Sequence, residues 1–274
     1  METTQPPRPA ATLLLVRDHP RGMQVFMVKR HHQIDFAGGA LVFPGGKVDQ
    51  ADTLPSVLTH CRPLPGISPD DMAFRVASIR EAFEECGVLL ARERMSGELI
   101  RAAALADLER RYRQAVETKA VYLGDVASRE NLELATDRLT PFAHWITPVM
   151  APKRFDTHFF LAEAPEDQVA LHDGGETVDS LWIRPQDALE QAAAGTLTII
   201  WPTRMNLQKL ARHHHVADTI AAARDSTVVT VLPEMAAGPN GQVMRIPETA
   251  GYGISEIPIH EVMGGRPSPA PRAR

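Results

Sequence analysis

Three glutamates, Glu81, Glu84 and Glu85, follow one another at spacings that place their side chains on one face of a helix. Carboxylates held about 5–6 Å apart at Cβ repel one another unless a cation lies among them. Divalent ions such as Mg²⁺ prefer oxygen ligands and keep part of their water shell for a phosphate substrate. Arg80 lies four residues before Glu84 and can hold one carboxylate in place. The pattern indicates a divalent-cation site, although a solvated helix with i,i+4 ion pairs has the same composition.

The helix that carries these glutamates is predicted to run from about Asp71 to Leu90. The sequence Pro69-Asp70-Asp71 is typical of a helix start, because acidic residues meet the positive end of the helix dipole there. Gly87 marks a point where the backbone turns tightly or approaches another element. The predicted buried stripe consists of Val76, Ile79, Phe83 and Leu90.

The composition is that of an ordinary globular protein, since 44% of the 274 residues are hydrophobic and 23% are charged. The net charge of −5 argues against nucleic-acid binding as the main function. No apolar stretch is long enough for a membrane span, and no signal peptide precedes the first strand. Cys61 and Cys86 form neither a metal-ligand spacing nor a disulfide framework, so we expect a cytoplasmic protein.

The rest of the chain alternates between strand-like and helix-like stretches, which predicts an α/β (α+β) fold with a mixed sheet between helical layers. Strands are predicted at 11–17, 23–29, 40–43, 142–147, 155–162 and 178–183, and helices at 98–117, 185–195 and 203–213. A hairpin is predicted between 227–232 and 242–246, because Asn240-Gly241 is a strong turn signal. The expected organisation is a disordered start (1–9), a main domain (10–215) with insertions at 53–70 and 98–140, an extension (216–265) and a disordered tail (266–274). The stretch from Asp49 to Pro69 is polar and carries four prolines, which predicts an insertion on the surface.

Two segments of the chain together resemble the Nudix box. Gly46 is followed after five residues by Asp52, and later comes Arg80-Glu81-x-x-Glu84-Glu85-x-Gly87-Val88, which matches the second half of that motif at every fixed position. Two departures are visible. Asp52 stands where the family has Glu, and 27 residues (53–79) rather than seven separate it from Arg80.

Further motifs are similar to those of the coenzyme A diphosphatase-like Nudix proteins of the peroxisomal type. They are Phe43-Pro44-Gly45-Gly46, Trp145-Ile146-Thr147-Pro148, Arg154-Phe155-Asp156-Thr157 and Glu176 ahead of Trp182. The resemblance covers roughly residues 10–213 and implies an α/β/α sandwich. It also implies hydrolysis of a nucleoside diphosphate derivative by water attack at phosphorus, with Mg²⁺ or Mn²⁺ as cofactor.

The resemblance implies roles for the residues of the helix. Glu84 and Glu85 are expected to be the main metal ligands, Glu81 a ligand or general base, and Arg80 an orienting partner. Gly46 is expected to pack beside the helix together with Gly45 and to offer a carbonyl ligand, and both glycines are also candidates for substrate binding.

Residues outside the helix are candidates for the base and for substrate binding. Glu176 follows Gly174-Gly175 in a loop that can bring its carboxylate over a metal site, although a solvated acid fits the same sequence. Arg30 and Arg154 can bind phosphate in bidentate fashion, with surface ion pairs as the alternative. His213-His214-His215 is not expected to bind metal, because consecutive helical residues point about 100° apart.

The substrate that the resemblance favours is coenzyme A or acyl-coenzyme A, giving 3′,5′-ADP and a 4′-phosphopantetheine product. ADP-ribose, NADH and an mRNA cap are alternative substrates. A non-catalytic Nudix module that senses a nucleotide is an alternative function, but it would not need all three glutamates. The expected partner is a small molecule, with no membrane and no nucleic acid, and a homodimer is left open.

Overall fold

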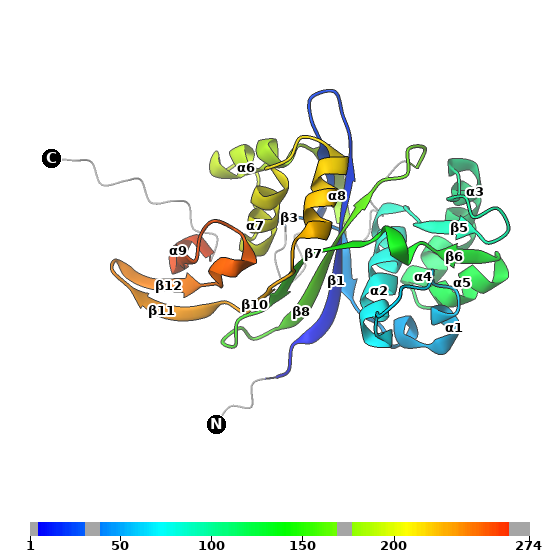
Figure 1. The fold of residues 1–274 in the computed structure, drawn as a ribbon, viewed down its shortest axis with the longest axis horizontal. Coiled ribbons are helices and arrows are strands. Elements are labelled where there is room, and N and C mark those ends of the chain that lie inside the picture. Colours follow the sequence, from blue (N-terminus) through cyan, green and yellow to red (C-terminus); the bar gives the residue numbers. More distant parts are fainter. Residues whose placement is uncertain (1–4, 31–38, 169–176, 263–274) are drawn as a thin grey trace.

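The computed structural model describes residues 5–30, 39–168 and 177–262, and within them eight strands form one mixed sheet (Figure 1). These strands are β1 (Arg8–Arg17), β2 (Gln24–Arg30), β3 (Leu41–Val42), β4 (Gly45–Lys47), β7 (Thr140–Ile146), β8 (Phe155–Glu163), β9 (Thr177–Ile183) and β10 (Thr230–Val231). Their order is β10-β7-β8-β1-β2-β3, while β4 pairs with β1 and β9 pairs with β2. The parallel pairs are β1–β8 and β7–β10.

Side chains alternate along the strands and thereby build a core on each face of the sheet. Leu13 and Leu15 of β1 belong to one core, whereas Leu14 and Val16 belong to the other. Helix α2 (Pro69–Cys86) covers the first face (Figure 1). The second face is covered by α6 (Pro185–Ala193), α7 (Trp201–Leu210) and α8 (Val216–Asp225). The α/β/α sandwich expected from the resemblance is confirmed.

The two insertions lie on the α2 side of the sheet (Figure 1). They contain the helices α1 (Pro55–Leu58), α3 (Ala102–Leu108), α4 (Gln114–Glu117) and α5 (Leu123–Arg129) and the strand β6 (Leu132–Leu134), which pairs with β5 (Ala91–Glu93) before the second insertion. A π-helical turn at Glu109–Arg113 joins α3 to α4, so the helix predicted at 98–117 is present but interrupted. The pairing of β5 with β6 was not predicted, because three-residue strands carry too little alternation.

The extension packs into the second core through Val231, Met244 and Ile257. It contains β11 (Glu234–Gly238), β12 (Gly241–Arg245), β13 (Glu256–Pro258) and α9 (Ile259–Val262). The predicted hairpin exists, but its first strand was placed wrongly at 227–232. The two-residue loop is Pro239-Asn240, so β12 pairs with the immediately preceding residues, Gly238 lying opposite Gly241. Helix α8 was not predicted.

The N-terminal boundary also differs from the prediction of a disordered stretch over 1–9. Strand β1 already begins at Arg8, because β8 supplies parallel partners there, with Arg8 opposite Phe155 and Pro9 opposite Asp156. The predicted tail at 266–274 lies outside the described residues. Among the helices that the structure describes, none combines the length and the apolar character that crossing a bilayer would need.

Candidate active site

Helix α2 is held at both ends by local signals in the sequence. The Ser68 hydroxyl accepts a hydrogen bond from the Asp71 backbone N–H at 3.0 Å, and Pro69 occupies the first helical position. The helix ends at Cys86 because Gly87 adopts the left-handed conformation with φ of 65°. The predicted stripe of Val76, Ile79 and Phe83 is fully buried, whereas Leu90 is buried beyond the helix end.

Arg80 is buried at the centre of the carboxylates, and all three nitrogens of its guanidinium donate hydrogen bonds. Nε and Nη2 bind the two Asp52 carboxylate oxygens, each at 3.0 Å, and Nη2 also reaches the Lys47 carbonyl at 2.8 Å. Nη1 binds Glu81 at 2.8 Å and Glu84 at 3.0 Å. Because these contacts use every N–H of the guanidinium, Arg80 orients the carboxylates and has no donor left for a substrate.

Asp52 corrects one expectation about the insertion that follows β4. The polar, proline-rich stretch from Asp49 to Pro69 was predicted to lie on the surface, yet Asp52 is only 2% exposed and Val57 is buried in the first core. Arg80 compensates the Asp52 charge, so burial of this carboxylate is tolerated. The segment that carries Gly46 and Asp52 therefore contacts the segment that begins at Arg80, although 27 residues separate Asp52 from Arg80.

The cluster carries more negative than positive charge. Asp52, Glu81 and Glu84 share the single guanidinium of Arg80, and Glu81 and Glu84 are only 13% and 14% exposed. Burial, assisted by repulsion from Glu84, raises the pKa of Glu81 to about 7 against the attraction of Arg80. Burial likewise raises the pKa values of Glu84 and Asp52. A hard divalent cation would relieve this repulsion, so the donor set fits Mg²⁺ or Mn²⁺.

Gly45 and Gly46 lie directly beside the helix, as predicted. The Gly45 backbone N–H donates to the Glu85 carboxylate at 2.9 Å. A Cβ on Gly46 would lie 2.6 Å from the Glu81 carboxyl carbon, whereas a Cβ on Gly45 would lie 2.7 Å from the Cα of Thr12 in β1. Only glycine therefore allows β4 to approach both the carboxylates and the neighbouring strand this closely.

The two glycines differ in what an added methyl group would displace. We expect Gly46→Ala to displace the Glu81 carboxylate and to lower kcat at least about tenfold, with unfolding free energy within about 1 kcal/mol of wild type. Gly45→Ala should instead push on the β1 backbone and destabilise the protein by about 1–3 kcal/mol. Urea denaturation and steady-state kinetics of both variants separate these outcomes. Equal stability losses in the two variants would contradict the assignment.

The raised pKa of Glu81 has a consequence for stability in metal-free buffer. The folded state binds the Glu81 proton more tightly than the unfolded state, so stability falls as pH rises from about 4.5 to 7. Each unit of pKa corresponds to about 1.4 kcal/mol, which gives an effect on the order of a few kcal/mol. We therefore expect Glu81→Gln to gain stability relative to wild type between pH 5 and pH 8.

Urea denaturation of both proteins across this range, with a chelator present, measures the difference. The comparison with the variant removes the contributions of other titrating groups, such as His158, whose pKa is lowered to about 4 by burial and acts in the opposite direction. A stability difference that does not change with pH would show that Glu81 ionises normally.

The second insertion packs against the C-terminal end of α2. The Arg113 Nε donates to the Glu84 backbone carbonyl at 2.9 Å, where a cation is favourable to the helix dipole. A Cβ on Gly87 would overlap the Glu109 carboxylate. Glycine is therefore required here both by the close packing of Glu109 against the helix end and by the left-handed backbone conformation. The insertion therefore helps to fix the position of the glutamate-bearing turn.

Among the remaining candidates that the structure describes, none makes a hydrogen bond to this cluster. Arg154 stands before β8 and donates to the backbone carbonyls of Thr147 at 3.1 Å and Gln5 at 3.3 Å. Arg30 is half-buried at the end of β2, where the pairing with β9 shifts register. Glu176 lies outside the described residues. The triplet His213-His214-His215 lies in the turn between α7 and α8, where His215 is 3.6 Å from Asp18.

One polar cluster was not predicted from the sequence. His144 in β7 and Asp156 and His158 in β8 face the α2 side of the sheet, and their donor atoms all lie within 4.8 Å of one another. The available signal was the spacing of two between Asp156 and His158, directly before the apolar run 159–162 of the same strand. The partner strand of β8, and hence the contribution of His144, could not be read from the sequence.

Comparison with known proteins relates this chain to one family model and to several curated proteins. Residues 58–210 match the family model of the NUDT19 Nudix domain. The human acyl-coenzyme A diphosphatase NUDT19 is 28% identical over 241 residues, covering 72% of this chain and 63% of that protein. The putative nudix hydrolase 7 of Caenorhabditis elegans is 28% identical over 207 residues, covering 75% and 61%. The chain thus spans less than two thirds of these curated relatives.

A solved structure extends this relationship to the fold. The NUDIX hydrolase from Alicyclobacillus acidocaldarius superposes with a TM-score of 0.66 at 26% identity. The alignment covers 80% of this chain and 97% of that one, so nearly the whole of that fold is contained in the present structure.

Proposed function

Because this chain belongs to the family of the NUDT19 Nudix domain, we propose that it is a divalent-metal-dependent hydrolase that cleaves the diphosphate bond of coenzyme A or acyl-coenzyme A. Water would add to one phosphorus and the bridging oxygen would leave with the other, giving 3′,5′-ADP and 4′-phosphopantetheine or its acyl derivative. The observation that carries the proposal is the buried group of Asp52, Glu81 and Glu84 around the single Arg80 guanidinium. The human relative named acyl-coenzyme A diphosphatase supports the substrate class.

Glu81, Glu84 and Glu85, with the Gly46 carbonyl, would hold Mg²⁺ or Mn²⁺, which would neutralise the diphosphate and lower the pKa of bound water. Arg80 would keep Glu81 and Glu84 in position through its Nη1 hydrogen bonds. Glu81, which packs against Gly46 and is nearly buried, is a candidate to accept the proton of the attacking water. Glu176 remains an alternative base.

Arg30 and Arg154 remain candidates for binding the phosphates of the substrate. The contacts of Arg154 with Thr147 and Gln5 favour a role in holding the β7–β8 connection. The choice between Mg²⁺ and Mn²⁺, a cytoplasmic location and a homodimer also remain predictions from the sequence.

A substrate panel tests the proposal. The full chain is incubated with coenzyme A, acyl-coenzyme A, ADP-ribose, NADH or a capped RNA, each with Mg²⁺ or Mn²⁺, and products are identified by mass. The proposal expects the highest kcat/KM for coenzyme A or its acyl esters. A higher value for ADP-ribose, NADH or the cap would overturn the substrate assignment. Tight nucleotide binding with no cleavage under either metal would favour the nucleotide-sensing alternative instead.

A further inference from the structure

The cluster of His144, Asp156 and His158 has the composition of a transition-metal site. The His144 Nε2 lies 2.5 Å from the Asp156 Oδ1, and the His158 Nε2 lies 3.9 Å from the same oxygen. We propose that these three side chains bind a borderline divalent ion, Zn²⁺ in the first instance, at a site separate from the glutamates of α2. Two imidazoles and one carboxylate suit Zn²⁺, whereas Mg²⁺ prefers oxygen ligands alone.

The backbone brings the three ligands together without strain. His144 lies directly opposite His158 in the antiparallel pair β7–β8, and Asp156 precedes His158 by two residues, so all three project from one face. Ligand atoms around a tetrahedral zinc lie roughly 3.3 Å apart, given Zn–N distances of about 2.0–2.1 Å. The two separations from Asp156, 2.5 and 3.9 Å, bracket this value, and all three ligand atoms lie within 4.8 Å of one another.

Neighbouring groups hold the two imidazoles in orientation. The Thr230 hydroxyl lies 2.8 Å from the His144 Nδ1, which leaves Nε2 directed toward Asp156. The Phe74 ring stacks on the His158 ring with centroids 4.0 Å apart and an interplanar angle of 25°. Metal-bound histidines characteristically have a hydrogen-bonded second ring nitrogen, as His144 has here.

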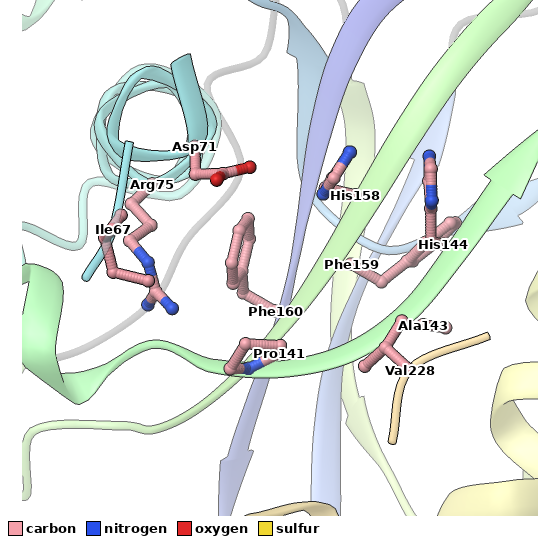
Figure 2. A pocket seen from close by; sticks show the side chains of 10 residues that line it. All are labelled: Ile67, Asp71, Arg75, Pro141, Ala143, His144, His158, Phe159, Phe160 and Val228. Carbon is pink, nitrogen blue, oxygen red and sulfur yellow. The ribbon is translucent and has the colours of Figure 1, made fainter. Parts of the chain in front are cut away.

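One side of the cluster remains open. The side chains of His144, Asp156 and His158 are 17%, 30% and 27% exposed. His144 and His158 line a pocket of about 250 Å³ together with Asp71 and Phe160 (Figure 2). Three protein ligands with an open fourth position is the arrangement of zinc sites that bind water or an external oxygen ligand.

The strand register separates this site from the glutamate cluster. Ala11 of β1 lies opposite Gly46 on one side and opposite His158 on the other. Two strand spacings of about 4.8 Å therefore place the His158 backbone roughly 10 Å from Gly46, on the same face of the sheet. The two sites share no ligand and differ in donor type, so they can be assigned to different ions.

Zinc titration of the metal-free full chain tests the proposal, with a chromophoric chelator as competitor and millimolar Mg²⁺ present to occupy the glutamates. The matched variants are His158→Phe, which keeps an aromatic ring on Phe74, and Asp156→Asn, which keeps the shape of the carboxylate. We expect one equivalent of tightly bound Zn²⁺ and a loss of affinity of about a hundredfold or more in either variant, since even outer partners of zinc ligands contribute 10–100-fold. Absorption of bound Co²⁺ in the visible range should be lost in parallel.

Two control variants test whether zinc binds elsewhere on the protein. Glu84→Gln should leave zinc affinity unchanged, and so should His215→Gln, which removes an exposed histidine beside an aspartate. Equal zinc affinity in wild type, His158→Phe and Asp156→Asn would overturn the proposal and leave a hydrogen-bonded His144–Asp156 pair only. Loss of zinc with Glu84→Gln would also overturn it, by placing the ion on α2. Neither result bears on whether the chain cleaves diphosphates, because the measurement requires no turnover.

Discussion

Replacement of Glu84 by glutamine is expected to lower kcat for diphosphate cleavage by about a thousandfold or more. The amide keeps the size of the side chain and can still accept the hydrogen bond from the Arg80 Nη1. It loses the negative charge that helps to bind a divalent ion. A thousandfold fall in kcat corresponds to a loss of several kcal/mol of transition-state stabilisation, because each tenfold change in rate corresponds to about 1.4 kcal/mol. Steady-state kinetics with saturating Mg²⁺ or Mn²⁺ measures the loss.

The fold should tolerate this change. Burial raises the pKa of Glu84, so removing its charge relieves repulsion, and the free energy of unfolding should stay within about 1 kcal/mol of wild type. Glu133→Gln is a suitable control, because the Glu133 side chain is 16% exposed, similar to that of Glu84, but pairs with Arg62 outside the cluster. The control should retain wild-type activity. Wild-type rates in Glu84→Gln would remove Glu84 from the metal site.

Replacement of Arg80 by methionine is expected to have the largest effect on stability. The substitution leaves Asp52, Glu81 and Glu84 without their common counter-charge. Removing one partner of a buried ion pair typically costs about 3–5 kcal/mol, because the remaining charge is uncompensated. Urea denaturation at pH 7.5 with a chelator present measures this loss directly.

Two comparisons test whether the uncompensated carboxylates cause the destabilisation of Arg80→Met. Arg92→Met removes an arginine that pairs with Asp137 at a more exposed position, where about 1 kcal/mol or less is expected. Lowering the pH protonates the buried carboxylates, so the destabilisation of Arg80→Met should shrink at pH 5. A loss below about 1 kcal/mol at pH 7.5 would show that Arg80 does not hold the cluster together.

The glutamate helix could be predicted from sequence because its information is local. The spacing of Glu81, Glu84 and Glu85 and the start signal at Pro69 lie within one continuous segment, whereas the helix ends at Cys86 and not at the predicted Leu90. The approach of Gly46 to Glu81 was expected from the resemblance to the Nudix box, and two consecutive glycines after a proline permit it.

Features that depend on long-range pairing could not be predicted. The polar composition around Asp52 indicated a surface loop, since nothing local shows that Arg80 compensates its charge 28 positions later. Two-residue strands such as β10 are too short to recognise, yet β10 brings Thr230 to His144. The His144 cluster likewise depends on the register of β7 against β8, which is fixed only when the sheet assembles.

The glutamates of α2 are proposed to support metal-dependent hydrolysis of a coenzyme A diphosphate bond. The most direct measurement is the mass of the products formed from acyl-coenzyme A by the full chain, with Mg²⁺ or Mn²⁺ and with excess chelator. We expect 3′,5′-ADP and acyl-4′-phosphopantetheine in equal amounts with metal and intact substrate with chelator. Intact substrate under all conditions, or equal cleavage with chelator, would contradict the claim.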